Sequence, residues 1–299
     1  MRRHVTAAVA VLALAALAGC GNDAAEPTAG ESSPTDSPTE ASASPSTPEP
    51  TEATDTASPS DEATTAAPPV TALVYYLVDD PRGIRIAREP HELPAEDTAA
   101  AMVAGPDDLD YATTWDPDTS VLGVSRQGDV VTVDLSEDAR SSNAGPDAAR
   151  RMVQQLVYTV TEVTGPTDKV LVTIEGQQPG RLWGGVRWTK PVGREDPMVV
   201  RNLVQIDYPA EGGTSGRRLT VTGEAATFEA TVPWRVIDAT GAVVRKGFTT
   251  AEEGMTLSPY TFSVRLEPGT YTVEVSEDDA SGGEGGVPPR TDNRTVTVG

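Results

Sequence analysis

Cysteine and histidine are almost absent from this sequence of 299 residues, which contains one cysteine and two histidines. The cysteine is Cys20, and the only histidine that follows it is His91. A zinc site built from several Cys or His ligands, a cysteine protease and a CxxC redox motif are therefore excluded. A Ser-His-Asp triad would depend on His91, which we expect in a solvated loop after Pro90, and no Gly-x-Ser-x-Gly motif occurs. We predict no catalytic residue, no cofactor and no metal site.

Basic residues are also scarce, because 23 Lys and Arg stand against 45 Asp and Glu, for a net charge of −22. Nucleic-acid binding requires clustered Lys and Arg that neutralise phosphates, so this balance argues strongly against it. Adhesion to anionic lipid headgroups is disfavoured for the same reason. No apolar stretch of membrane-spanning length follows residue 20.

The N-terminus has the pattern of an export signal. Arg2 and Arg3 precede an apolar run over residues 5–16, and Leu17-Ala18-Gly19-Cys20 follows. The last four residues resemble the bacterial lipobox. The resemblance implies that residues 1–19 are a lipoprotein signal peptide and that Cys20 is lipidated, which would place the protein on the outer face of the cell membrane. An ordinary secreted protein cut near Ala18 and an uncleaved anchor are the alternatives, and Sec or twin-arginine export both stay open.

Residues 20–69 have the composition of a tether. After Cys20 they consist mostly of Ala, Ser, Thr, Pro and acidic residues, without Lys or Arg. Such a segment buries too little apolar surface to offset the entropy of ordering, so we expect it to be disordered. Its length corresponds to a span of roughly 40 Å, enough to hold a folded part away from the membrane. Glycosylation of its Ser and Thr residues is left open.

Residues 70–178 alternate strand and helix signals, which predicts a small α/β layer with helices on one sheet face. A Pro opens the first expected helix and Gly-Pro ends both helices. The expected strands cover 73–78, 84–88, 120–125, 130–135 and 169–174, and the expected helices cover 94–104 and 146–163.

Four segments of this region, 102–106, 128–136, 155–161 and 170–176, resemble in sequence and order the GerMN domain of sporulation and spore germination. The resemblance implies a compact fold related to ring-building modules of sporulation machinery, with no established catalytic activity. Asp134 and Ser136 are candidate catalytic residues by type, but an Asp and a Ser at a strand end are expected to cap the backbone instead.

Residues 198–299 contain short alternating strands separated by turn clusters, which predicts an antiparallel sandwich. The segments 219–225, 228–232 and 234–238 resemble the immunoglobulin-like domain of bacterial spore germination, which commonly follows a GerMN domain. The fold class expected is therefore α+β, a small α/β GerMN-type domain followed by an immunoglobulin-like antiparallel β-sandwich. Phe228 and Trp234 are expected in its core.

Residues 179–197 form the expected interdomain linker, which holds the local basic cluster of an acidic chain. Two tryptophans lie among basic residues in it, and the candidate binding residues are Arg181, Trp183, Arg187 and Trp188. They would stack on a sugar or anchor a partner protein. The alternative, which we favour, is that the tryptophans fill the interface between the two domains.

The many acidic residues leave two further possibilities open. A glycosidase or peptidoglycan hydrolase requires only two suitably spaced carboxylates. The clusters Asp107-Asp108 and 277–279 would suit calcium by residue type, but neither has EF-hand spacing, and solvation is the expected state.

The sequence therefore predicts a non-enzymatic, lipid-anchored cell-envelope protein that binds another envelope protein or peptidoglycan, and the resemblance implies a role in sporulation or spore germination. The alternatives are an accessory lipoprotein that modulates a membrane sensor or transporter, and a carboxylate-dependent wall hydrolase. The lipid on Cys20 is the expected contact with the membrane. Oligomerisation is open, with ring formation implied by the resemblance alone.

Overall fold

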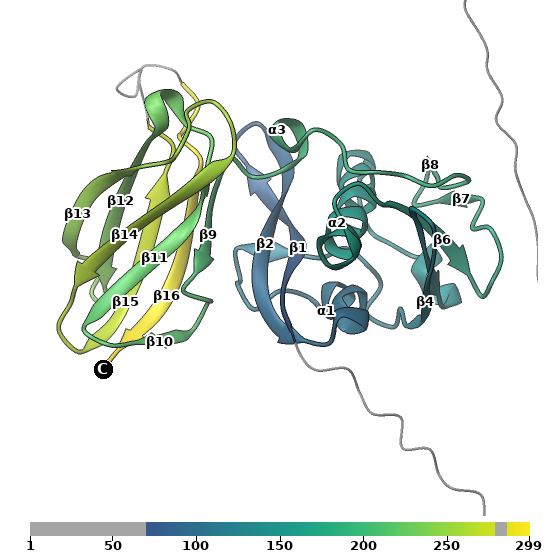
Figure 1. Cartoon of the computed structure of the whole chain (residues 1–299), viewed down its shortest axis with the longest axis horizontal. Helices are drawn as coiled ribbons and strands as arrows, with labels where there is room; N and C mark the ends of the chain where they lie inside the picture. Colours follow the sequence, from purple (N-terminus) through teal and green to yellow (C-terminus); the bar gives the residue numbers. More distant parts are fainter. Residues whose placement is uncertain (1–69, 279–285) are drawn as a thin grey trace, which may run out of the picture. The chain divides into compact units, whose positions relative to one another are not determined.

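The computed structural model describes residues 70–278 and 286–299 (Figure 1). The expected signal peptide, Cys20 and the tether to residue 69 lie outside the described residues. In the described part of the chain, no helix is long and apolar enough to cross a membrane. The buried apolar residues form two cores, one between Val74 and Val200 and one between Val204 and Val298. The predicted α+β fold class is confirmed.

A long hairpin opens the first region. Strand β1 (Val70–Asp80) pairs antiparallel with β2 (Gly83–Leu93), and the two-residue β3 (Tyr111–Ala112) lies on the other side of β1. Gly83 turns the chain between the arms with a φ of 126°, which L side chains rarely adopt. The aromatic run of β1 explains why this strand is central, because Tyr75 and Tyr76 are fully buried.

Two α-helices cover this hairpin. The first, α1 (Thr98–Ala104), follows a short 3₁₀ turn, η1 (Ala95–Asp97), so the α-helix begins later than Pro94. The second, α2 (Pro146–Thr164), matches the predicted span, with Pro at its first position and Gly165 as its C-cap. Its Tyr158 ring lies 5.1 Å from the ring of Tyr75 on β1.

A second small sheet lies on the other side of α2 (Figure 1). It has the order β4 (Val121–Gln127), β5 (Val130–Leu135) and β6 (Lys169–Ile174), with η2 (Glu137–Arg140) after β5. Strands β5 and β6 are parallel, and α2 makes the crossover between them. The single layer expected from the sequence is therefore wrong, because β1 pairs only with β2 and β3 among the described strands, and α2 packs between two separate sheets.

The segment expected as a linker is folded onto the first region. Strands β7 (Arg181–Leu182) and β8 (Val186–Arg187) form a short hairpin, and α3 (Pro197–Val200) follows. Val192 extends this attachment, because its backbone exchanges two hydrogen bonds of 2.8 Å with Val170 on β6.

The second region is a sandwich of two sheets, ordered β10-β16-β15-β12-β13 and β14-β11-β9. Its strands are β9 (Val204–Tyr208), β10 (Gly213–Ser215), β11 (Arg218–Ala225), β12 (Thr231–Asp238), β13 (Val243–Thr250), β14 (Ser258–Arg265), β15 (Gly269–Ser276) and β16 (Thr291–Val298). Every second residue of β11 is buried, as a half-covered strand requires. All pairings in it are antiparallel except β10 with β16.

Two expected strands of this region are shorter than predicted. The span 226–238 begins with a 3₁₀ turn, η3 (Phe228–Ala230), in which Glu229 has a φ of 53°. The span 199–208 begins inside α3, which Asp196 caps by accepting a hydrogen bond from the Met198 amide. A capped turn at α3 and a 3₁₀ turn without a side-chain cap at η3 replace the extended conformation that the alternating pattern suggested.

Candidate functional site

A buried arginine, Arg294 of β16, joins the two regions. Its Nη1 donates to Asp108 Oδ2 at 2.6 Å and to Asp292 Oδ1 at 3.1 Å. Its Nη2 donates to Tyr111 Oη at 2.9 Å and to the Ile206 carbonyl oxygen at 3.1 Å. The Tyr111 hydroxyl in turn donates to Asp292 Oδ1 at 2.7 Å. The guanidinium is thus shared between carboxylates of both regions, with none of its side chain exposed to solvent.

The buried charges of this group shift one another's pKa. Burial raises the pKa of Asp108 to about 6, although the Asp110 amide and Arg294 oppose the rise. Burial likewise raises the pKa of Asp292. Burial lowers the pKa of Arg294, but Asp292, Tyr111 and Asp108 raise it more, so the guanidinium remains charged.

A second group of ion pairs continues across the same boundary. Arg88 on β2 binds both carboxylate oxygens of Asp207 on β9, with Nε at 2.8 Å and Nη2 at 2.7 Å. Arg88 also lies 3.1 Å from Glu224 on β11, which accepts from Arg201 Nη2 at 2.6 Å. Paired planar geometry of this kind gives the strongest arginine–carboxylate bonds.

A third group lies at the turn of the β1–β2 hairpin. The Asp80 carboxylate binds Arg290 and also Arg85, whose Nε is 3.4 Å away. Glu277 binds Arg290 at 3.1 Å and Arg82 at 3.3 Å. We call these three groups the charged seam, defined by Arg294, Arg88 and Arg290 with their partners. Separating the two regions would leave the buried charges of these ion pairs without their partners, which costs free energy. The seam therefore holds the two regions as one unit.

An open cleft of about 1060 Å³ lies beside the third group, in the first region. Four segments line it, namely the β1–β2 turn, the start of α2, the β7–β8 turn and residues 195–199 around the start of α3. Its charged lining residues are Arg82, Arg85, Arg150, Arg151, Asp147 and Glu195.

The arginines of the cleft are only partly neutralised. Arg151 donates from Nε to the Ile84 carbonyl at 2.9 Å, and its nearest carboxylate contact, with Glu195, is 3.9 Å long. The side chain of Arg150 is 67% exposed and pairs with Asp147, which is 77% exposed. Exposed pairs of this kind are weak. The lining therefore offers guanidinium groups to an anionic ligand, although the chain as a whole is acidic.

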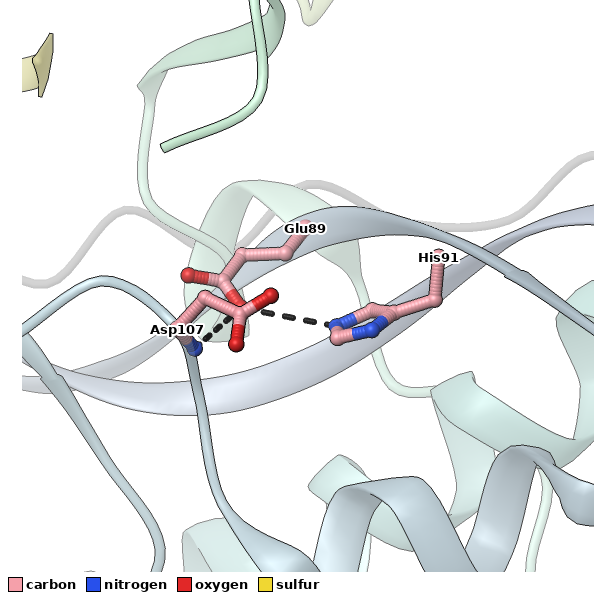
Figure 2. Close-up of side chains that lie close together, drawn as sticks. All are labelled: Glu89, His91 and Asp107. Carbon is pink, nitrogen blue, oxygen red and sulfur yellow. Dashed lines mark hydrogen bonds and ion pairs between the residues drawn. The ribbon is translucent and has the colours of Figure 1, made fainter. Parts of the chain in front are cut away.

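Glu89, His91 and Asp107 form a cluster of side chains (Figure 2). The cluster adjoins the charged seam, because Glu89 Oε1 accepts from the Asp108 amide. Each residue offers a ligand atom, and these atoms lie within 4.8 Å of one another. Burial raises the pKa of Glu89, but the hydrogen bond with His91 and the amides of Asp108 and Asp107 lower it more, so the carboxylate stays ionised. His91 Nε2 is 3.5 Å from Glu89 Oε2 and 3.2 Å from Tyr76 Oη.

The expected solvated loop around His91 is wrong. His91 lies within β2, where it pairs with Ala72, and its side chain is 17% exposed. Strand β2 continues through Pro90, which pairs with Leu73 at the sheet edge, where a proline is tolerated. Solvation of Asp108 is also wrong, since the residue is 4% exposed. The spacing of Glu89 and His91, two residues apart on one strand, places them on the same face and could have indicated part of this cluster. Asp107 is distant in the sequence, so no local pattern indicated it.

The candidate binding residues of the expected linker divide by type. Trp183 and Trp188 are buried in the first core, and their indole N–H groups donate to the carbonyls of Ala139 at 2.9 Å and Val170 at 3.1 Å. Arg181 and Arg187 are exposed. Both indoles therefore stabilise the first region, and their expected position at the interface between the two domains is wrong because their partners all belong to the first core. Trp183 also lines the cleft described above. Binding through the two arginines stays a prediction.

The structure also tests the expected capping roles of Asp134 and Ser136 and the expected core positions of Phe228 and Trp234. Asp134 accepts from the Thr173 hydroxyl at 2.7 Å and from the Gly176 amide at 2.8 Å, and Ser136 Oγ accepts from the Ser120 amide at 2.9 Å, as expected for caps. Phe228 is 55% exposed, so its expected core position is wrong, because it lies in the η3 turn. Trp234 packs against the second core and stacks on Phe262 at 4.7 Å.

Comparison with protein families agrees with this architecture. Residues 68–179 match the family described as sporulation and spore germination. Residues 203–284 match the immunoglobulin-like domain of bacterial spore germination, Gmad2. The chain carries a GerMN domain followed by a Gmad2 domain. The charged seam thus joins the GerMN domain to the Gmad2 domain, and the cleft and the Glu89–His91–Asp107 cluster belong to the GerMN domain.

Solved structures similar to this GerMN–Gmad2 chain include the first GerMN domain of the sporulation protein GerM from Bacillus subtilis, with 21% identity and a TM-score of 0.33, over 42% of this chain and 100% of that one. A Clostridium perfringens protein provisionally classed as a lipoprotein has 20% identity and a TM-score of 0.31, over 43% of this chain and 90% of that one. Comparison with curated proteins gives no match.

Proposed function

We propose that this GerMN–Gmad2 protein is a non-enzymatic, lipid-anchored binding protein on the outer face of the cell membrane, acting in sporulation or spore germination. The observation that carries the proposal is the arginine-lined cleft of about 1060 Å³, open on a unit that the charged seam holds together. The lipobox-like Leu17–Cys20 segment and the tether supply the anchor and the reach.

The partner that fits the cleft presents carboxylate or phosphate groups, because guanidinium groups bind planar and tetrahedral oxyanions through paired hydrogen bonds. An envelope protein with an acidic segment is the leading candidate, and an anionic wall polymer is the second. A sensor or transporter that this lipoprotein modulates would be one form of the protein partner.

A carboxylate-based hydrolase has less support. Asp108 and Asp292, the carboxylates that share Arg294, are 4% exposed each. Hydrolysis requires two carboxyl groups that reach the substrate from both sides of the bond. A pair enclosed by the charged seam does not meet this requirement.

The anchor is tested by fractionating cells that express the wild type and the Cys20→Ala variant. Wild type is expected in the membrane fraction, and the variant is expected in the soluble extracytoplasmic fraction. Identical fractionation of the two forms would show that the anchor is wrong.

The cleft is tested by cross-linking intact cells and identifying captured partners by mass spectrometry. Arg150→Glu reverses an exposed charge of the cleft and is expected to abolish capture of the dominant partner. Arg217→Glu is the matched control, because Arg217 is 60% exposed and pairs with the exposed Glu267 on the Gmad2 domain. Equal capture by wild type and Arg150→Glu would exclude the cleft as the contact surface. Release of soluble muropeptides by the purified protein would favour the hydrolase.

A further inference from the structure

The Glu89–His91–Asp107 cluster has the spacing of a metal site. The distance of 3.5 Å between His91 Nε2 and Glu89 Oε2 is close to the separation of two ligands on a tetrahedral zinc ion, about 3.3 Å for bonds of about 2.0 Å. The Asp107 carboxylate completes a set of ligand atoms within 4.8 Å of one another. Figure 2 shows the His91 ring and the Asp107 side chain both directed at the Glu89 carboxylate.

The carboxylate at the centre of the cluster is held in place before any ion binds. Glu89 is 3% exposed, and its Oε1 accepts from the Asp108 amide at 2.7 Å. Its Oε2 accepts from the Asp107 amide at 3.0 Å. Oε1 keeps a lone pair, and Oε2 keeps one when His91 Nε2 binds an ion in place of Glu89. Outer hydrogen bonds of this kind orient metal ligands in proteins.

The cluster also has an excess of negative charge. Among the ion pairs of residues 70–278 and 286–299, Glu89 has only His91 as a partner and Asp107 has none. The neighbouring Asp108 and Asp292 already share the Arg294 guanidinium. A divalent cation would therefore supply a charge that the neighbouring side chains do not.

We propose that Glu89, His91 and Asp107 bind a zinc ion. One imidazole nitrogen and two carboxylate oxygens are ligands that zinc accepts, and three protein ligands leave the fourth position to water or to a group of a partner. Two ligands come from β2, and the third comes from the loop that also carries Asp108 of the charged seam. The ion therefore ties this loop to β2 and stabilises the contact between the two domains.

The test measures binding of ZnCl₂ to the purified protein by calorimetry, with competition by a chelator. Wild type is expected to bind one zinc ion per chain and to gain thermal stability with added zinc. His91→Ala and Asp107→Asn are each expected to weaken binding at least tenfold, which is the usual loss when a ligand or its support is removed. Asp118→Asn, which changes an exposed acid elsewhere in the same domain, is expected to bind as wild type does.

The histidine supplies a second readout. Because His91 is the only histidine after the signal peptide, its ring resonances report zinc coordination directly in NMR spectra. Unfolding in the presence of chelator checks that each variant is folded. Absence of stoichiometric binding, zinc binding unchanged by His91→Ala and Asp107→Asn, or calcium binding that ignores His91→Ala would each overturn the proposal.

Discussion

Arg294 Nη1 of the Gmad2 domain lies 2.6 Å from Asp108 Oδ2 of the GerMN domain, and the two side chains are 0% and 5% exposed. Removing the guanidinium would leave two buried carboxylates, Asp108 and Asp292, without their cation. We therefore expect Arg294→Met to lose about 3–5 kcal/mol of the free energy of unfolding, measured by denaturant titration. Arg217→Met, at an exposed pair, is expected to change it by less than about 0.5 kcal/mol. Equal losses in the two variants would contradict a stabilising seam.

Gly223 on β11 is required by a close approach of the backbone. A Cβ at this position would lie 1.9 Å from the Gln205 carbonyl oxygen and 2.6 Å from Tyr260 Oη. We expect Gly223→Ala to destabilise the protein by about 3 kcal/mol or more, since the carbonyl belongs to the paired strand β9 and has little freedom to move. Gly216→Ala is the control, because its Cβ meets nothing within 4 Å. A variant Gly223→Ala with the melting temperature of wild type would refute this packing.

Trp188 distinguishes a core role from a binding role. The side chain is 1% exposed and donates to the Val170 carbonyl, whereas the adjacent Arg187 is exposed. We expect Trp188→Ala to lose about 3–5 kcal/mol of unfolding free energy. Arg187→Ala is expected to change it by less than about 0.5 kcal/mol. Wild-type stability in Trp188→Ala, with partner capture lost, would favour the stacking alternative instead.

The raised pKa of Tyr158 leads us to expect that the folded protein loses stability at alkaline pH. Burial raises its pKa to about 12, although Arg201 and Arg194 oppose the rise, and an unfolded tyrosine titrates near pH 10. The folded state favours the neutral phenol, so this contribution to stability is fully present below pH 10 and is lost as the pH rises towards 12. The loss amounts to about 3 kcal/mol at most.

The measurement compares the unfolding free energies of wild type and Tyr158→Phe between pH 9 and pH 12. The hydrogen bond of 2.7 Å from Tyr158 Oη to the Glu195 carbonyl gives wild type a constant advantage below pH 10. That advantage should shrink above pH 10. A difference that stays constant to pH 12 would contradict the raised pKa.

Local signals in the sequence predicted the elements that local chemistry controls. Helix α2 begins at Pro146 and ends beside Gly165, and the spans of β5 and β6 agree with the prediction, because capping residues and apolar periodicity act within a few residues. Where a turn interrupts an alternating run, as at the start of α3 and at η3, the same local reasoning failed, since propensity alone did not decide between a turn and a strand.

The candidate site was less accessible to sequence reasoning. Glu89 and Asp107 are 18 positions apart, and Asp108 and Arg294 are 186 apart, so no spacing pattern relates them. The buried tryptophans illustrate the same limit, because composition identified Trp183 and Trp188 as notable and only packing against Ala139 and Val170 showed their role.

The sequence by itself determined the α+β class, the two-domain order and the negative net charge, since these depend on composition, periodicity and local turn chemistry. The prediction of a lipid anchor at Cys20 also rests on the sequence alone. The tertiary structure alone decided which charges meet. The effect of a carboxylate or a guanidinium depends on burial and on a partner within a few ångströms, and residues distant in the chain supply both.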